Sequence, residues 1–302
     1  MVMFLDEERI AGLLGWDALI ATMEEALAAF SRGRVLQPVR NMLTIEEGRR
    51  YLGIMPAVAE AAMGLKLVSF YPGNAGSAVP THHAMILLFR SDTGEPLAVM
   101  DGRLITEMRT AAVSAAATRL LAAPGCRVLA LLGSGVQARA HLAALTHLHR
   151  YNEVGVWSRT PEHARRFAAE HGIVATDIEE AVRGADVVVT ATAAIEPILR
   201  GCWLKPGAHV NAVGAPRPTW RELDDAAMAN VLIVDSRDAV LKESGDVILS
   251  QAPIHAELGE ILAGLKPAPT GATTIFKSVG LAIEDVAAAK LVYDAALGES
   301  AA

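Results

Sequence analysis

The first hundred residues combine one helical segment with several segments of strand character. Apolar residues recur at helical spacing over residues 17–30, and Asp17 stands where it favours the N-terminal end of a helix dipole. The turn sequence Ser91-Asp-Thr-Gly94 separates two apolar runs and predicts a hairpin. We expect strands at residues 37–43, 51–55, 63–71, 84–89 and 96–100. This part of the chain therefore predicts a mostly antiparallel sheet with a leading helix.

After Pro124 the pattern changes to an alternation of short apolar runs and helical segments. Residues 106–123 are alanine-rich and predict a helix that Pro124-Gly125 ends. Residues 127–132 are nearly all apolar, as in a parallel strand covered on both faces. We expect further strands at residues 153–157, 173–175, 187–190, 209–213 and 231–234, and helices at 137–149, 161–171, 178–182 and 280–296. The alternation predicts an α/β fold class, a doubly wound parallel sheet of Rossmann type next to a mixed, strand-rich α+β domain.

Composition and charge narrow the classes of function. The chain has 302 residues, of which 52% are hydrophobic and 20% charged, so a disordered chain is excluded. A net charge of -7 offers no broad basic face, and we expect neither nucleic acid nor a membrane as partner. Cys126 and Cys202 lack metal-ligand spacing, so we expect no metal. The N-terminus carries acids where a signal peptide needs basic residues, and we expect a cytoplasmic protein.

The sharpest motif follows the predicted strand at residues 127–132. Gly133-Ser134-Gly135-Val136-Gln137-Ala138 has the pattern G-x-G-x-x-A between a strand and a helix. The first glycine permits the tight turn, the second lets a pyrophosphate approach the backbone, and the alanine allows helix and strand to pack closely. The N–H groups at the start of the helix would bind the phosphates. The motif predicts dinucleotide binding by residues 133–137.

The end of the next strand indicates which dinucleotide is preferred. There the chain reads Ser158-Arg159-Thr160, without the acidic residue that would hold the ribose hydroxyls of NAD. An arginine with two hydroxyls can bind a 2′-phosphate through charge-assisted hydrogen bonds. We therefore expect NADP(H) to be preferred, with NAD(H) as the alternative. Thr190 and Thr192, at the end of a later strand, are expected to face the cofactor, and Val213 and Gly214 complete the candidate set.

Further motifs stand in one linear order along the chain. They are Lys66-Leu-Val-Ser-Phe-Tyr71, Met100-Asp-Gly102, Arg109-Thr-Ala-Ala-Val-Ser114, the glycine motif, Val213-Gly-Ala-Pro-Arg-Pro-Thr-Trp-Arg-Glu-Leu-Asp224, Leu241-Lys-Glu-Ser-Gly-Asp246, Glu257-Leu-Gly-Glu260 and Phe276-Lys-Ser-Val-Gly280. Together they resemble the ornithine cyclodeaminase/mu-crystallin family over nearly the whole chain, most of all its mu-crystallin branch of ketimine reductases.

The resemblance implies a domain division, an assembly and a site. It implies a substrate-binding and dimerisation domain of residues 1–120 plus 279–302, an NAD(P)-binding domain of residues 121–278, and a homodimer. Members act on cyclic imino acids or amino acids. The catalytic residues carry over as Arg40, Lys66 and Arg109.

The same three residues suit imine reduction chemically. Two guanidinium groups can hold the carboxylate of a 2-imino acid and orient its C=N carbon for hydride transfer. Lys66 lies on a largely apolar strand, where burial and nearby arginines would lower its pKa and make it a proton donor.

One position departs from the cyclodeaminase pattern. Ornithine cyclodeaminases carry an aspartate where this chain has Pro216, and proline can neither bind an ammonium group nor act as a base. We therefore favour a reductase of cyclic ketimines such as Δ1-pyrroline-2-carboxylate or Δ1-piperideine-2-carboxylate. The alternatives are an ornithine cyclodeaminase, an amino acid oxidoreductase similar to alanine dehydrogenase, and an NADP-dependent carrier of small ligands.

Two interpretations are possible for each of a few other polar residues. His82 or His83 could line the site or be structural, and Asp246 could contact substrate or accept hydrogen bonds from local N–H groups. Lys277 and Ser278 could reach the nicotinamide, or Ser278 could cap the last helix.

Overall fold

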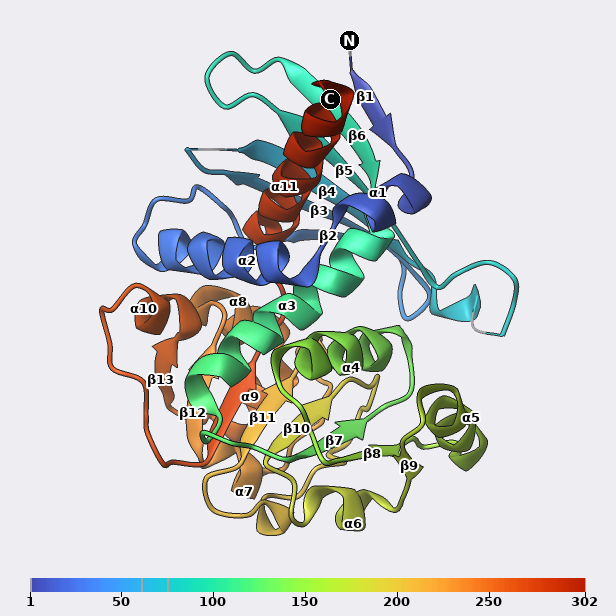
Figure 1. Cartoon of the computed structure of the whole chain (residues 1–302), viewed down its shortest axis with the longest axis vertical. Helices are drawn as coiled ribbons and strands as arrows, with labels where there is room; N and C mark the ends of the chain where they lie inside the picture. Colours follow the sequence, from blue (N-terminus) through green and yellow to red (C-terminus); the bar gives the residue numbers. More distant parts are fainter. Residues whose placement is uncertain (1, 61, 75, 302) are drawn as a thin grey trace. The chain divides into compact units, whose positions relative to one another are not determined.

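The computed structural model describes residues 2–60, 62–74 and 76–301. The chain divides into two compact units, Met1–Arg109 with Leu281–Ala302, and Thr110–Gly280 (Figure 1). The division lies inside helix α3 (Arg103–Leu121), whereas we expected the boundary at the end of this helix. Over the described residues no helix has the length and apolar content needed to cross a membrane.

The first unit contains a sheet of six described strands in the order β1-β6-β5-β4-β3-β2. All neighbours are antiparallel except β1 and β6, which are parallel. The strands are β1 (Met3–Leu5), β2 (Asn41–Glu46), β3 (Arg50–Val58), β4 (Met63–Phe70), β5 (His82–Phe89) and β6 (Pro96–Asp101). Its helices are α1 (Glu7–Leu13), α2 (Trp16–Ser31), the short η1 (Pro72–Asn74) and α11 (Ala282–Ala301). The predicted antiparallel sheet and leading helix are present, and β1 and α1 are additions that the pattern did not indicate.

One face of this sheet is buried beneath helices. Helix α11 packs on β3, β4 and β5, and also on α2 (Figure 1). Gly64 of β4 permits this approach, because a Cβ atom there would lie 3.3 Å from Val286 of α11. Residues at alternate positions, such as Met55, Ile86 and Met100, are buried on the sheet. The polar residue Lys66 shares this alternation and is buried as well.

The second unit is built on a parallel sheet. Eight described strands lie in the order β13-β12-β14-β11-β10-β7-β8-β9, and every neighbouring pair is parallel. They are β7 (Val128–Leu132), β8 (Glu153–Trp157), β9 (Val174–Ala175), β10 (Val187–Thr190), β11 (His209–Ala212), β12 (Val231–Val234), β13 (Ile254–Glu257) and β14 (Thr274–Lys277). The helices are α4 (Val136–Leu148), α5 (Pro161–His171), α6 (Ile178–Val182), α7 (Asp225–Met228), α8 (Arg237–Glu243), α9 (Gly245–Ser250), α10 (Leu258–Leu262) and the short η2 (Gly201–Trp203).

The strand order confirms the predicted doubly wound sheet. The chain proceeds from β7 to β8 and β9 on one side, and then continues from β10 on the other side of β7. The order therefore reverses between β7 and β10, and ligands of such sheets bind at the carboxyl ends of the strands beside this point. Strands β13 and β14 were not predicted. β14 lies between β11 and β12, although it follows both in sequence.

Candidate active site

The glycine turn connects β7 to α4 with a backbone that demands glycine at its first position. Gly133 has φ +128°, and a Cβ atom there would lie 2.6 Å from the carbonyl oxygen of Ala191. Gly135 is the N-cap of α4, and a Cβ atom built on it meets no atom within 4 Å. Open space therefore lies over the first N–H groups of the helix, where a pyrophosphate would bind. The residues present fit a dinucleotide.

The end of β8 is connected to this turn. The hydroxyl oxygens of Ser134 and Ser158 lie 3.0 Å apart and share a hydrogen bond. Arg159 and Thr160 are exposed beyond them, and Thr160 is the N-cap of α5. These side chains lie where a Rossmann sheet receives the adenosine ribose of its cofactor. Their chemistry suits a phosphate on that ribose.

Thr190 and Gly214, two of the residues expected to contact the cofactor, have a common protein partner. Thr190 is fully buried, and its hydroxyl donates to Glu222 over 2.7 Å. The backbone N–H of Gly214 donates to the same carboxylate over 2.9 Å. Thr190 and Gly214 are thus both held by Glu222, and their contact with the cofactor stays a prediction. Thr192, which is half-buried, donates to Glu222 through both its N–H and its hydroxyl, each over 2.7 Å.

Glu222 is a residue that the sequence motifs contained but did not single out. Its buried carboxylate connects the end of β10 with the residues after β11. Burial raises its pKa, and the charge of Lys277 acts in the opposite direction. Glu222 therefore fixes the loops at the carboxyl edge of the sheet.

Lys277 and Asp246 complete this network. Lys277 is fully buried, and its Nζ donates to the carbonyl oxygen of Gly214 over 2.7 Å and lies 2.9 Å from Oδ2 of Asp246. Oδ1 of Asp246 accepts hydrogen bonds from the N–H groups of Glu222 and Leu223. Of our two interpretations of Asp246, the structure supports the hydrogen-bond acceptor. Lys277 likewise has protein partners, namely Gly214 and Asp246.

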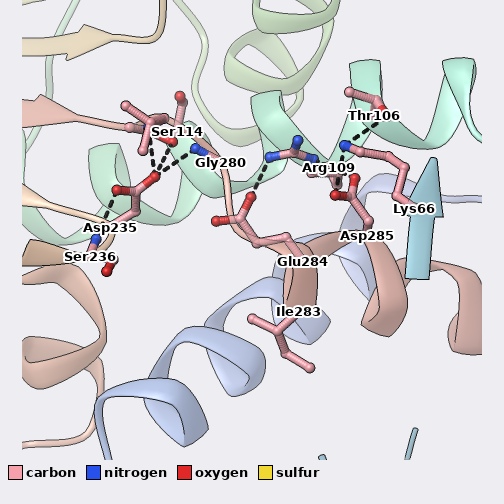
Figure 2. A network of polar contacts seen from close by, with 12 residues as sticks. Lys66, Thr106, Arg109, Ser114, Asp235, Ser236, Gly280, Ile283, Glu284 and Asp285 are labelled. Carbon is pink, nitrogen blue, oxygen red and sulfur yellow. Dashed lines mark hydrogen bonds and ion pairs between the residues drawn. The ribbon is translucent and has the colours of Figure 1, made fainter. Parts of the chain in front are cut away.

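Ser278 does not cap the last helix. Its hydroxyl donates to Oδ2 of Asp235 over 2.9 Å, and the N–H groups of Val279 and Gly280 donate to the same oxygen. Asp235 thereby fixes the segment that leads out of β14 (Figure 2).

The first unit contains a buried cluster of charged side chains. Lys66 comes from β4, Thr106 and Arg109 from α3, and Glu284 and Asp285 from the first turn of α11 (Figure 2). The Nζ atom of Lys66 lies 2.7 Å from Oδ2 of Asp285 and 3.4 Å from Oγ1 of Thr106. The Nε atom of Arg109 donates to Oδ1 of Asp285 over 2.9 Å, and its Nη1 donates to Glu284. The side chains of Lys66 and Arg109 are only 3% and 5% exposed. Because water does not surround them, their positive charges are stabilised by these carboxylates.

The electrostatics of this cluster set Lys66 apart from an ordinary lysine. Burial lowers the pKa of Lys66 from 10.5 to about 8; the charge of Asp285 opposes this, while those of Arg109 and Arg40 reinforce it. Burial also lowers the pKa of Arg109, but the charges and hydrogen bonds of Asp285 and Glu284 outweigh this effect and raise its pKa. At neutral pH Lys66 is charged but can release its proton readily.

Arg40 and His82 belong to the same surroundings. The charge of Arg40 acts on the pKa of both Lys66 and His82. Loss of hydration, followed by the charges of Lys66, His83 and Arg40, lowers the pKa of His82 to about 4, and its ring centroid lies 5.0 Å from that of Phe70. The structure thus brings Arg40, Lys66 and Arg109 into one electrostatic group. Glu284 and Asp285 were missed, although two adjacent acids in an alanine-rich helix are a signal that could have found them.

Comparison with known proteins identifies the family to which this fold and these motifs belong. The model of the ornithine cyclodeaminase/mu-crystallin family matches residues 1–300. The chain belongs to this family. It is 54% identical to the ketimine reductase mu-crystallin of Mus musculus, over 96% of each chain.

Two solved structures share the fold. The Δ1-pyrroline-2-carboxylate reductase of Thermococcus litoralis, in complex with NADH and L-proline, has a TM-score of 0.93 and 36% identity over 99% of this chain and 98% of its own. An archaeal alanine dehydrogenase dimer with bound NAD has a TM-score of 0.92 and 33% identity, over 99% of this chain and 97% of its own. Both support the expected class of fold.

Proposed function

We propose that the protein reduces the C=N bond of cyclic 2-imino acids with a reduced nicotinamide dinucleotide. The substrates would be Δ1-pyrroline-2-carboxylate or Δ1-piperideine-2-carboxylate, and the products proline or pipecolate. The observation that carries the proposal is Lys66, a buried ammonium group with a pKa of about 8 in a cluster with two arginines. Similarity to the ketimine reductase of Mus musculus and to the pyrroline-2-carboxylate reductase of T. litoralis supports the same chemistry.

The charges of the cluster favour a substrate that carries one carboxylate. Among Arg40, Lys66, Arg109, Glu284 and Asp285, three cations are matched with two carboxylates. A substrate carboxylate would add a further anion to this group, in which cations predominate. We assign the binding of this carboxylate to Arg40 and Arg109, whose positive charges both act on Lys66.

Lys66 would supply the proton of the reaction. Its ammonium group donates a proton to the imine nitrogen, which makes the adjacent carbon more electrophilic. The reduced cofactor supplies the hydride that this carbon accepts. The product is a secondary amine, and Lys66 is left neutral until it takes up a proton from solvent. A donor with a pKa of about 8 stays protonated at neutral pH and still transfers its proton readily.

For the cofactor we propose binding at the glycine turn with a preference for NADP(H). Gly133, Ser134, Gly135, Val136 and Gln137 would hold the pyrophosphate, since the turn leaves open space over the start of α4. Ser158, Arg159 and Thr160 would hold the 2′-phosphate. The structures of relatives contain NADH or NAD, so we also expect NAD(H) to serve as a cofactor. Thr192 and Val213 are half-buried and stay candidates for contacts to the cofactor.

We further propose that two copies of the chain form a homodimer through the sheet of the first unit. Its second face presents apolar residues that one copy leaves partly or largely exposed: Leu52, Ile54, Leu65, Leu67, Met85, Leu87 and Val99. A sheet that is apolar on both faces requires a cover on both. The archaeal alanine dehydrogenase, which is a dimer, supports the assembly of two copies. The cytoplasmic location stays a prediction.

The test is a substrate comparison with two readouts. Purified protein is mixed with NADPH and either Δ1-pyrroline-2-carboxylate or Δ1-piperideine-2-carboxylate, while the absorbance of the reduced nicotinamide is followed. In parallel, ornithine and NAD are supplied and ammonia is measured. We expect oxidation of NADPH that depends on the imino acid, and no release of ammonia. Release of ammonia without net reduction of the cofactor would instead identify a cyclodeaminase, and tight NADPH binding without either reaction would identify a carrier.

A further inference from the structure

Asp285 contacts both buried cations of the charged cluster. One oxygen of its carboxylate lies 2.7 Å from Nζ of Lys66, and the other accepts a hydrogen bond of 2.9 Å from Nε of Arg109 (Figure 2). The three side chains come from β4, α3 and α11. A single fully buried carboxylate therefore connects three elements at the position of the proposed proton donor.

The start of α11 is a favourable place for such a carboxylate. The helix begins at Ala282, so Glu284 and Asp285 lie in its first turn. Carboxylates near a helix N-terminus are stabilised by the helix dipole, which favours the charged form. The fully buried Asp285 thus lies at a helix N-terminus and between two cations, both of which stabilise negative charge.

We infer that Asp285 is a positioning residue for Lys66, which holds the ammonium group in place and keeps it protonated for donation to the imine. The inference rests on the proposed function and adds a residue to it. The groups around Lys66 are Asp285 from α11, Arg109 and Thr106 from α3, His82 from β5, and Arg40. Of these only Asp285 is an anion, so its charge alone opposes the two arginines and the effect of burial.

Glu284 provides a matched control. It belongs to the same helical turn, is equally buried, and pairs with Arg109. The charges that act on the pKa of Lys66 come chiefly from Asp285, Arg109 and Arg40. Neutralising Glu284 thus removes one carboxylate from the cluster and leaves the direct partner of Lys66 in place.

The experiment measures the titration of Lys66 itself. The chain has six lysines, so protein labelled with ¹³C at the lysine Cε gives few signals, and the signal of Lys66 is the one absent from Lys66→Met. In Asp285→Asn we expect the pKa of Lys66 to fall by about one unit or more, and in Glu284→Gln by less than about half a unit. The alkaline limb of the kcat/KM profile with Δ1-pyrroline-2-carboxylate should move to lower pH with the Lys66 signal, so that a shift of one unit lowers kcat/KM about fivefold at pH 8.

An unchanged pKa of Lys66 in folded Asp285→Asn would overturn the inference, as would equal shifts in Asp285→Asn and Glu284→Gln. If Asp285→Asn fails to fold, Asp285→Glu is titrated instead, in which the charge is kept but displaced by one methylene group. For this variant the inference requires a change in the pKa of Lys66 and a matching shift of the alkaline limb of the kcat/KM profile. If neither changes, the inference is overturned.

The two proposals can fail separately. The titration of Lys66 needs no turnover, so it reports on Asp285 even if the protein reduces no ketimine. Ketimine reduction combined with a titration of Lys66 that is indifferent to Asp285 would leave the proposed function intact and remove the positioning role.

Discussion

The side-chain oxygen of Gln37 accepts a hydrogen bond of 2.7 Å from the backbone N–H of Ile283, the second residue of α11. Gln37 thereby satisfies an N–H group at the start of that helix. The bond connects the segment that leads to Arg40 with the turn that carries Glu284 and Asp285. The segment that carries Arg40, which we assign to bind the substrate carboxylate, is thus connected by a hydrogen bond to the helix that carries the charged cluster.

Loss of this bond should weaken substrate binding more than catalysis. In Gln37→Ala the helix loses an acceptor worth about 1 kcal/mol, and the segment before Arg40 loses an anchor. We expect KM for the imino acid to rise severalfold, with a smaller change in kcat. Steady-state kinetics test this, and Gln37→Glu, which keeps an acceptor oxygen, should preserve KM. Equal KM values in wild type and Gln37→Ala would contradict the link.

Substitution of Lys66 should separate chemistry from cofactor binding. Lys66→Met removes the proposed proton donor and keeps most of the side-chain volume on β4. We expect the turnover of Δ1-pyrroline-2-carboxylate to fall by about 10²-fold or more. The affinity for NADPH, measured by fluorescence titration, should stay within about twofold, since the glycine turn belongs to the other unit. A parallel loss of both would mean that Lys66 is structural.

The cofactor preference should respond to a reversal of charge at Arg159. In Arg159→Asp a carboxylate would repel the 2′-phosphate and accept hydrogen bonds from the ribose hydroxyls of NAD. We expect the ratio of kcat/KM for NADPH over NADH to fall by at least about tenfold. Arg166→Asp, on the exposed side of α5, is the control for the same change in net charge. A ratio that is the same in both variants would exclude Arg159 from the site.

The proposed dimer predicts a change of assembly when its sheet face becomes charged. Leu67 lies on the partly exposed face of β4, and Leu67→Glu would place a carboxylate in the proposed interface. We expect sedimentation analysis to give a dimer for the wild type and a monomer for this variant. Leu241→Glu, at a 57% exposed leucine of α8, should remain dimeric. A dimeric Leu67→Glu would locate the interface elsewhere.

The stability at acid pH should reflect the buried His141. Its ring bonds to the carbonyl oxygen of Gln137 and the hydroxyl of Ser114, and burial lowers its pKa from 6.5 to about 4. Between these pH values the unfolded chain binds the proton and the folded chain does not, so stability falls as the pH decreases. His141 alone would contribute about 3 kcal/mol to the loss from pH 6.5 to pH 4.

Urea denaturation of His141→Gln at pH 6.5 and pH 4.5 tests this contribution. The decline in unfolding free energy should be smaller than in the wild type, because glutamine takes up no proton. His163→Gln, at an exposed position of α5, serves as control and should decline as the wild type does. An equally steep decline in His141→Gln would contradict the assignment.

The parts of the fold that local pattern determines could be predicted. The glycine turn could be predicted because its motif stands directly between β7 and α4, and the φ of +128° at Gly133 is a local backbone requirement. Strand β14 was missed because only Ile275 and Phe276 of its four residues are apolar, whereas the equally short β12 is entirely apolar. Its place between β11 and β12 is set by pairing that sequence order does not reveal.

The partners of the site residues depended on contacts between distant parts of the chain. Lys66 was singled out by its place on an apolar strand, whereas Asp285 lies far along the sequence and contacts it only through tertiary packing. Thr190 was singled out because strand ends of this fold face the cofactor, but its hydrogen bond to the buried Glu222 could not be predicted from the sequence. Periodicity indicates which face of an element is buried, but not which polar group meets it there.

The first unit is assembled from both ends of the polypeptide, with α11 completing a layer begun by residues 1–109. During synthesis on the ribosome, Thr110–Gly280 emerges as an unbroken stretch and can adopt its final form first. Residues 1–109 cannot complete their packing at that stage, because Lys66 and Arg109 form their ion pairs with Asp285 only after α11 has left the exit tunnel. Arrival of α11 is therefore the step that supplies Lys66 and Arg109 with their counter-ions.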